Sequence, residues 1–456
     1  MEQQEKFIQM TTAPVGRLIG RLAVPTVVSM LITSVYNMAD TFFVGLLDNT
    51  SATGAVGVVF SLMSIIQACG FLFGQGSGTF ISRMLGQQQR ERAERMAAVG
   101  FFFSFFTGCA ISVLGLTFLD PLARLLGSTE TILPYAREYL RVILLGAPFM
   151  TAAMTLNNQL RFQGSAFYSM IGIGTGGVLN ILLDPVFIFV LDMGVVGAAW
   201  ATILSQTVSF ALLLAGCFRG GNLRICPRLF RPCWGDVAEI FRGGFPSLCR
   251  QALASLATIA LNRMAGLFGG DAAIAAMSVA GRIMHLAFAA ILGFGQGFQP
   301  VCGFNFGAGL YARVRQAFWF CVKLGTALLL VASAAGFVFA PQLVGLFSSD
   351  PAVLAEGVVA LRLQCVSFPL TAWFAMSTML MQTIGRVVPA SVLSAARQGL
   401  FFIPLVIGLP LLIRAFLPEV SPVLGVQLAL PLADILTSVM AIPVCLVGMR
   451  RYLPIS

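Results

Sequence analysis

The chain has 456 residues, of which 58% are hydrophobic and only 10% are charged, and its mean hydropathy is +0.89. A chain this apolar cannot hide its surface inside a soluble core, which excludes a soluble enzyme or binding module. The net charge of +10 comes from Lys and Arg residues scattered over short segments, without the aromatic-interleaved basic patch of a nucleic-acid-binding protein. We therefore expect these residues to lie beside anionic lipid, and we expect no nucleic-acid partner.

Apolar stretches of about 20 residues or more recur along the whole chain, which is the length that a helix needs to cross the hydrocarbon of a bilayer. The alternating pattern of an outer-membrane barrel is absent. The sequence therefore predicts an all-α integral membrane protein with twelve transmembrane helices. The expected spans are 18–46, 54–84, 94–119, 135–160, 167–190, 195–218, 237–268, 274–305, 315–340, 356–383, 388–416 and 424–449.

The basic residues predict the orientation of these helices. Most Lys and Arg residues, with Arg161 counted among them, fall in segments on the same side of the membrane as the two termini. The positive-inside rule then predicts a multi-pass protein of the cell inner (cytoplasmic) membrane with both termini in the cytoplasm. The first ten residues, MEQQEKFIQM, are too polar for a secretory signal, so we expect the first helix to be retained.

Motifs of soluble catalysis are missing from the sequence. The ten Cys residues are scattered without paired metal-ligand spacing, and there is no phosphate loop, nucleophile elbow or metal motif. We therefore expect neither an enzyme nor an ATP-driven pump, and no cofactor.

A shift of 221 residues places the second half of the chain on the first. The aligned positions include Arg21 and Arg242, Pro25 and Pro246, Gly45 and Gly266, the tripeptides Gly74-Gln75-Gly76 and Gly295-Gln296-Gly297, Gly86 and Gly307, Arg141 and Arg362, Pro148 and Pro369, and Gly164 and Gly385. Each half holds six helices, an even number, so the halves are predicted to be parallel repeats about an axis along the membrane normal. We expect an amino-terminal lobe (1–218), a cytoplasmic loop (219–236) and a carboxyl-terminal lobe (237–456), an arrangement that suits alternating access.

Three acids fall within apolar spans. A carboxylate at Asp40, Asp184 or Asp434 costs several kcal/mol unless it is paired, ion-bound or protonated, so intramembrane acids are candidates for function. The repeat does not preserve the first two, because Asp40 is aligned with Leu261 and Asp184 with Leu405. Ion chemistry is therefore expected in the amino lobe.

Polar residues at one depth of the membrane complete this candidate site. Helix direction places Asp40, Asp184 and Thr202 in the outer half of the bilayer, and Asn180 shares the helix face of Asp184. Tyr36, four residues before Asp40, brings a hydroxyl to the helix face of Asp40. This oxygen-rich set suits a proton shared between carboxylates or a hard cation such as Na+, and the sequence leaves H+ and Na+ open.

Structural interpretations compete with these functional ones. In the alternative interpretation, the residues Asp40, Asn180, Asp184 and Thr202 form an internally satisfied polar cluster that holds helices together. Pro25 weakens the first helix and marks either a functional bend or a plain kink. The Gly-Gln-Gly tripeptides favour close helix packing over ligand contact, and His285, the single His, favours a packing role over proton relay.

The runs PTVVSMLITSVYNMADTFFVG and NILLDPVFIF, together with the two Gly-Gln-Gly tripeptides, resemble the prokaryotic type of the multidrug and toxic compound extrusion (MATE) family over essentially the whole chain. The resemblance implies two six-helix lobes and export of drugs or toxic organic cations in exchange for H+ or Na+. It implies an amino-lobe site at the residues matching Asp40, Asn180, Asp184 and Thr202, with a tyrosine matching Tyr36 nearby and a helix bend at the proline matching Pro25.

The sequence departs from family members that carry acids in helices 7 and 10. Arg250 and Gln251 occupy the relevant stretch of helix 7, and residues 358–383 contain no Asp or Glu. Asp434 either pairs with an intramembrane arginine such as Arg397 or acts as a carboxyl-lobe proton site, so Asp434, Arg397 and Arg250 form a second candidate charged site.

We assign a candidate substrate cavity to Asn37, Met154, Asn157 and Gln163. The favoured function is a secondary active multidrug efflux transporter working as a monomer by alternating access in the lipid bilayer. The rival is a flippase for lipid-linked anionic precursors, which needs a basic cavity and is expected to have fourteen helices. A receptor or scaffold needs neither the duplication nor the buried acids.

Overall fold

The structure is a computed structural model and describes residues 2–47 and 50–454. Eleven helices in this part of the chain are long and apolar enough to cross a membrane. The longest, α9, has 74 residues, with non-helical backbone at Gly270 (φ 64°, ψ −159°). A continuous helix of that length would extend about 110 Å, several times the thickness of a bilayer, so α9 supplies two spans that meet at Gly270. The predicted twelve transmembrane helices are confirmed.

The expected spans agree with the observed helices to within a few residues, and the short helices α1, α5 and α11 are additional. The amino-terminal half comprises α1 (Glu2–Thr12), α2 (Val15–Gly45), α3 (Thr50–Gly86), α4 (Arg90–Thr117), α5 (Leu119–Leu125), α6 (Leu133–Phe162), α7 (Ala166–Pro185), η1 (Val186–Val190), α8 (Gly194–Cys217) and η2 (Pro227–Leu229). The carboxyl-terminal half comprises α9 (Trp234–Gly307), α10 (Tyr311–Val338), α11 (Ala340–Gly345), α12 (Pro351–Ser367), η3 (Phe368–Leu370), α13 (Thr371–Thr383), α14 (Val387–Ala395), η4 (Ala396–Phe402), α15 (Ile403–Phe416) and α16 (Val423–Tyr452).

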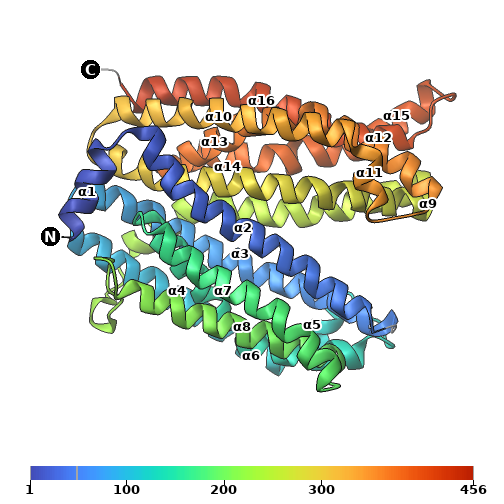
Figure 1. The fold of residues 1–456 in the computed structure, drawn as a ribbon, viewed down its shortest axis with the longest axis horizontal. Coiled ribbons are helices and arrows are strands. Elements are labelled where there is room, and N and C mark those ends of the chain that lie inside the picture. Colours follow the sequence, from blue (N-terminus) through green and yellow to red (C-terminus); the bar gives the residue numbers. More distant parts are fainter. Residues whose placement is uncertain (1, 48–49, 455–456) are drawn as a thin grey trace.

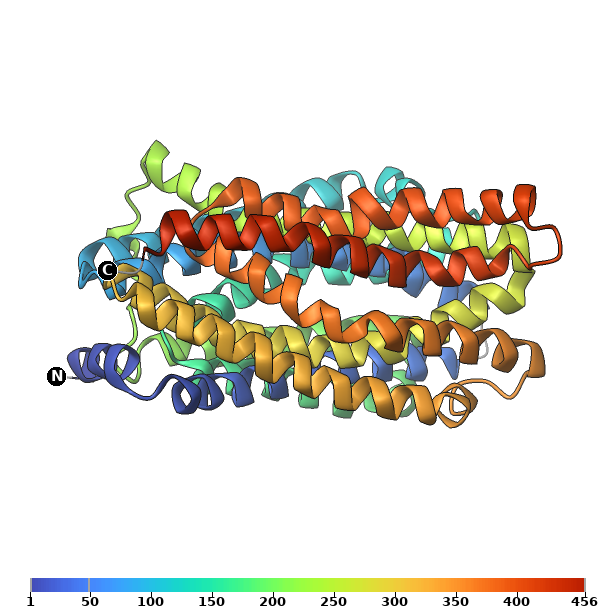
Figure 2. The ribbon, with the colours of Figure 1, turned by 90° about the horizontal axis from the view of Figure 1, so that it is seen from above.

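The two halves form two helical lobes that lie side by side, with both termini at one end (Figures 1 and 2). The backbone repeats as well as the sequence does. Gly164, just after α6, has φ 78°, and its counterpart Gly385, just after α13, has φ 80°. Glycine suits this left-handed turn because it lacks a Cβ atom. The predicted parallel repeat is confirmed.

The lobes touch where glycines let the backbones of α3 and α9 approach. A Cβ atom on Gly86 would lie 2.2 Å from the Phe304 carbonyl oxygen, and one on Gly307 would lie 2.1 Å from the Arg83 carbonyl oxygen. These are the same contact made once from each copy of the repeat, because the four residues form two aligned pairs. A larger residue at either glycine would force the lobes apart.

The Gly-Gln-Gly tripeptides extend this contact. A Cβ atom on Gly76 would lie 2.0 Å from the Ile240 carbonyl oxygen, and one on Gly297 would lie 2.5 Å from the Ala23 Cα atom on α2. The glycines of the two tripeptides therefore take part in close helix packing, as the sequence predicts. We call the contact region formed by Gly76, Gly86, Gly293, Gly297 and Gly307 the interlobe seam.

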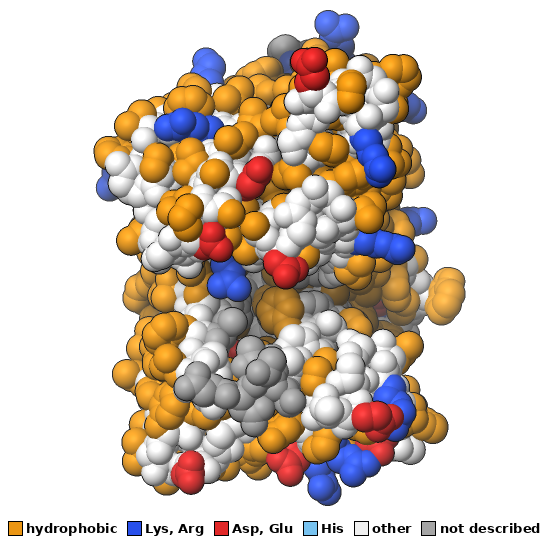
Figure 3. Space-filling model, turned by 90° about the vertical axis from the view of Figure 1, so that its right-hand side faces the viewer, with side chains coloured by type: hydrophobic (Ala, Val, Ile, Leu, Met, Phe, Trp, Pro, Cys, Tyr) orange, Lys and Arg blue, Asp and Glu red, His pale blue; other side chains and the backbone are white. Residues whose placement is uncertain are grey.

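The end that carries the termini is tied together by further polar contacts. Helix α1 bridges the lobes, because Lys6 donates to the Ser165 hydroxyl (2.6 Å) in the amino lobe while the Met10 carbonyl accepts from the Asn305 side chain (3.0 Å) on α9. Toward the opposite end the two groups of helices diverge in Figure 1, and the space-filling view of that end shows a hollow between them (Figure 3). The molecule is therefore closed at the end that bears the termini.

The interlobe seam predicts opposite effects for two glycine substitutions on α3. Gly76→Ala places a methyl group against the Ile240 carbonyl, and overpacking of this kind costs about 1–3 kcal/mol. Gly57→Ala meets nothing within 4 Å and should be neutral or stabilising, because alanine favours helix. Thermal unfolding of both variants in detergent measures the difference. Equal melting temperatures would contradict the seam.

Candidate functional site

Helices α7 and α8 bring three of the predicted polar residues together. The Asn180 side-chain amide donates to an Asp184 carboxylate oxygen (3.2 Å) and lies 3.4 Å from the Thr202 hydroxyl, and all three side chains are buried. The helices can approach because Gly176 has no side chain, since a Cβ atom there would lie 2.8 Å from the Ser209 Cβ atom. An acid, an amide and a hydroxyl therefore share one small volume between two helices.

Helix α2 adds the remaining two predicted residues, Tyr36 and Asp40. Its Tyr36 ring lies against Gly177 of α7, where a Cβ atom would be 3.2 Å from Tyr36 Cδ1. Asp40 lies close enough to both Tyr36 and Asp184 for its charge to act on them. The structure thus gathers Tyr36, Asp40, Asn180, Asp184 and Thr202 at one place in the amino lobe. We call these five residues the acid cluster.

The acid cluster holds oxygen atoms that no donor satisfies. Asp40 Oδ1, Asn180 Oδ1 and Asp184 Oδ2 are buried, and none has a hydrogen-bond partner among the residues that the structure describes. Neither acid forms an ion pair within that same part of the chain. Buried acceptors of this kind cost free energy unless a proton or a cation completes them. The donor set suits H+ or Na+, because hard cations favour carboxylate, amide and hydroxyl oxygens.

The residues of the candidate substrate cavity are more dispersed. Asn157 is buried and accepts a hydrogen bond from Ser169 of α7, while Met154 packs against Gly70 of α3. Gln163 lies just beyond the end of α6 and accepts from the Leu223 backbone N–H (2.8 Å), away from the middle of the helix. Asn37 is half-buried beside Tyr36 on α2. The structure therefore does not assemble these four residues into one lining.

Pro25 lies inside α2, which is helical from Val15 to Gly45 without a break. Proline has no N–H group, so the carbonyl one turn earlier loses its usual helical partner. The next residue, Thr26, donates to the Gly293 carbonyl (2.6 Å) in the interlobe seam. The place where α2 lacks a backbone hydrogen bond is thus adjacent to the interlobe seam. The bend expected at Pro25 stays a prediction.

The second candidate site lies in the carboxyl lobe, where Arg397 and Asp434 form a buried ion pair. Arg397 Nε lies 2.7 Å from Asp434 Oδ1, and the other carboxylate oxygen accepts from the Ser367 hydroxyl (3.0 Å). The guanidinium also lies over the rings of Phe288 (4.8 Å) and Phe374 (5.5 Å). Of the two alternatives for Asp434, pairing with Arg397 is the one present in the structure.

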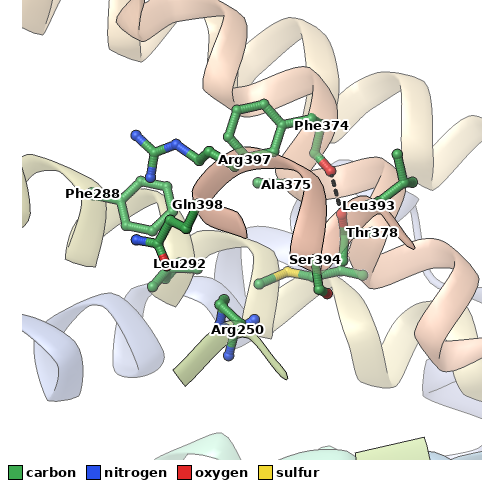
Figure 4. A pocket seen from close by; sticks show the side chains of 11 residues that line it. Arg250, Phe288, Leu292, Phe374, Ala375, Thr378, Leu393, Ser394, Arg397 and Gln398 are labelled. Carbon is green, nitrogen blue, oxygen red and sulfur yellow. Dashed lines mark hydrogen bonds between the residues drawn. The ribbon is translucent and has the colours of Figure 1, made fainter. Parts of the chain in front are cut away.

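Arg397 lines a pocket between the two parts of α9, α13 and the segment formed by α14 and η4 (Figure 4). The pocket has about 470 Å³ of empty space, open solvent included. Arg250 lines the same pocket from the first part of α9, and no hydrogen bond or ion pair to it is found among the described residues. The lining residues are Arg250, Phe288, Leu292, Phe374, Ala375, Thr378, Met379, Leu393, Ser394, Arg397 and Gln398. The pocket is therefore apolar in the main, with two arginines.

Sequence reasoning misplaced one residue, Arg161, which was expected in a cytoplasmic loop. Helix α6 continues through it, and Arg161 is only 1% exposed between the lobes. Its guanidinium donates to Gln296 (2.5 Å) across the seam and to Asn158 (2.7 Å), which also accepts from Gln75 (3.0 Å). The repeat held a signal for this role, because Arg161 is aligned with Gln382, another buried polar residue.

A duplicated twelve-helix membrane bundle with unpaired acids buried in one lobe has the architecture of a secondary transporter. The model of the MatE family matches residues 25–186 and 246–407, and these two segments are the two copies of the 221-residue repeat. The chain therefore belongs to the MatE family, which is a family of transporters and not of enzymes.

Known proteins of this kind align along nearly the whole chain. The multidrug export protein MepA of Staphylococcus aureus (strain NCTC 8325 / PS 47) is 26% identical over 403 residues, covering 88% of this chain and 89% of the relative. A solved outward-facing multidrug resistance MATE family transporter is 28% identical with a TM-score of 0.90, covering 98% of this chain and 97% of its own. A MOP superfamily transporter from Pyrococcus furiosus, described as having a binding pocket of reverse polarity, is 28% identical with a TM-score of 0.88 and the same coverage.

The buried ion pair predicts a large loss on removing one partner. Asp434→Ala leaves Arg397 charged in the interior, which costs about 3–5 kcal/mol. Asp120→Asn, which breaks the exposed pair with Arg137, should have a much smaller effect because water screens that pair. Chemical unfolding in mixed micelles compares the two variants. A loss at Asp434 no larger than at Asp120 would contradict the buried pair.

Proposed function

We propose that the chain is a secondary active multidrug efflux transporter, which exports amphipathic and often cationic compounds in antiport with H+ or Na+ by alternating access. It works as a monomer in the inner membrane with both termini in the cytoplasm. Its amino lobe is 1–218, its connecting loop 219–236 and its carboxyl lobe 237–456. The staphylococcal relative is a multidrug export protein, which supports export of drug-like compounds.

The unsatisfied oxygens of the acid cluster are the observation that carries this proposal. A cluster that only held helices together would satisfy its own members, because each unmet buried acceptor lowers stability. Asp40, Asn180 and Asp184 instead each keep one buried acceptor for which the described residues offer no donor. Reversible binding of a proton or Na+ is the use that makes such an arrangement advantageous.

The proposed coupling runs through α2. Two carboxylates in one buried site repel each other, and binding of H+ or Na+ at Asp40 and Asp184 removes that repulsion. Helix α2 then repacks at Pro25, and the amino-lobe cavity shrinks so that substrate leaves outward. Because Thr26 joins α2 to the interlobe seam, the same movement reaches the contact between the lobes. Release of the ion to the cytoplasm resets the transporter.

Asp40→Asn tests the antiport directly. In everted vesicles containing the variant, we expect addition of ethidium to release no H+ or Na+, and ethidium uptake to fall at least tenfold, because the amide cannot bind and release the ion. Asp120→Asn is the matched control, since its carboxylate is exposed outside the acid cluster. Unchanged exchange in Asp40→Asn would refute the proposal.

Thr202→Val distinguishes the two ions. If Na+ is the coupling ion, loss of the hydroxyl removes an oxygen ligand, and the Na+ concentration for half-maximal efflux should rise at least fivefold. If H+ is the coupling ion, a pH gradient should drive efflux in the variant nearly as well as in the unmodified protein. Proteoliposomes with each gradient imposed separately measure both. Efflux driven by neither gradient would exclude antiport.

The rival function is a flippase for lipid-linked anionic precursors. The two arginines of the carboxyl-lobe pocket favour it, since a phosphate group would be attracted to them. The twelve helices and the acid cluster favour efflux instead, because a flippase of this kind is expected to have fourteen helices and a predominantly basic cavity. Loss of ion exchange in Asp40→Asn with retained dye binding would support the efflux transporter.

A further inference from the structure

We propose that the carboxyl-lobe pocket is a binding subsite for an amphipathic organic anion, whose carboxylate, sulfonate or phosphate group lies at Arg250 and Arg397. This inference rests on the proposed transport function for its purpose, and it names a substrate class that this function leaves open. The observations that carry it are the pocket itself, its balance of charge and its lining (Figure 4).

The balance of charge in and beside the pocket is positive. Arg397 is neutralised by Asp434, whereas Arg250 has no acid partner among the described residues. Arg161 lies near enough for its charge to act on Arg250, and among the described residues its guanidinium donates to the neutral side chains of Gln296 and Asn158. The region therefore contains three arginines (Arg161, Arg250 and Arg397) and one carboxylate (Asp434), which leaves an excess of two positive charges.

An uncompensated guanidinium inside a membrane protein is costly. A charge without a partner loses hydration as it enters the interior, so intramembrane arginines are normally paired or functional, and Arg250 is half-buried. A purely structural arginine would have an acid or carbonyl partner, as Arg397 has in Asp434. Arg250 borders the pocket instead, where the oxygen atoms of a bound anion would supply the missing partner. The planar guanidinium suits the paired oxygens of a carboxylate or phosphate.

The remaining surface of the pocket selects an amphipathic ligand over a small inorganic ion. Phe288, Leu292, Phe374 and Met379 offer aromatic and flexible apolar contacts, and Thr378 adds a hydroxyl. A ligand with one acidic group and an aromatic body therefore matches both the charge and the apolar lining of the pocket.

The acid cluster and this pocket have opposite polarity. The acid cluster holds two carboxylates that form no ion pair among the described residues, whereas the carboxyl-lobe pocket is lined by Arg250, which has no acid partner in that part of the chain. A compound that is repelled at one site is thus attracted at the other. The chain can therefore recognise acidic or zwitterionic compounds as well as cations.

Binding of a matched pair of probes tests the subsite without any ion gradient. The full-length protein in phosphatidylcholine nanodiscs is titrated calorimetrically with naphthalene carboxylate and with naphthalene carboxamide, which differ in charge and hardly in shape. We expect the carboxylate to bind at least tenfold more tightly than the amide. Arg250→Gln should abolish this preference, Arg250→Lys should keep part of it, and Arg414→Gln, at an exposed arginine on α15, should leave it unchanged.

Folding is checked in the same samples. Removing an unpaired charge from this half-buried position should leave the melting temperature of Arg250→Gln unchanged or higher, whereas a structural arginine would lower it. Equal binding of the two probes, or an unchanged preference in Arg250→Gln, would overturn the subsite. Repeating the titration in phosphatidylglycerol nanodiscs separates the sources of the anion, since loss of carboxylate binding there would assign the pocket to a lipid headgroup and overturn the soluble ligand. None of these outcomes depends on antiport, which Asp40→Asn tests separately.

Discussion

The close approach of α3 to α9 is the constraint on which the rest of the molecule depends. Gly76, Gly86 and Gly307 bring backbone of one lobe within contact of backbone of the other, with no room for a methyl group. Small residues are the usual means of close helix contact in membranes, where lipid provides no hydrophobic drive for association. The glycine contacts of the seam are made with backbone atoms, and the Arg161–Gln296 and Thr26–Gly293 hydrogen bonds cross it, so the lobes separate there only if these bonds break.

Helix α2 connects this seam to the acid cluster. Asp40 and Thr26 are 14 residues apart on one continuous helix, a distance of about 21 Å. A change of charge at Asp40 therefore acts on the same rigid element that bonds Gly293 in the seam. Pro25 provides the place where that element can change its shape, since the hydrogen-bond ladder is already interrupted there. This linkage is the physical basis of the coupling that we propose.

Local patterns made much of the fold predictable. Apolar stretches predict all twelve spans, the repeat predicts two parallel lobes, and helical spacing alone predicts that Asn180 lies beside Asp184. The position of Arg161 could not be predicted this way, because burial at a helix end depends on how the opposite lobe packs over it. The same holds for Arg250. That it has no acid partner among the described residues depends on several helices together and leaves no local signal in the sequence.

The acid cluster and the carboxyl-lobe pocket differ in charge because a few aligned positions of the repeat carry different residues, and helix packing explains this difference. Arg397 is aligned with Gly176 and Arg250 with Ser29. In the amino lobe Gly176 lets α8 approach α7 closely, so an arginine there would separate the helices that assemble the acid cluster. In the carboxyl lobe the chain around Arg397 forms the π-helical segment η4, whose wider turn accommodates the larger side chain and directs it to Asp434. Close helix packing at Gly176 and a widened helix at Arg397 are thus alternative solutions at one repeat position, and only the widened helix admits a charged side chain there.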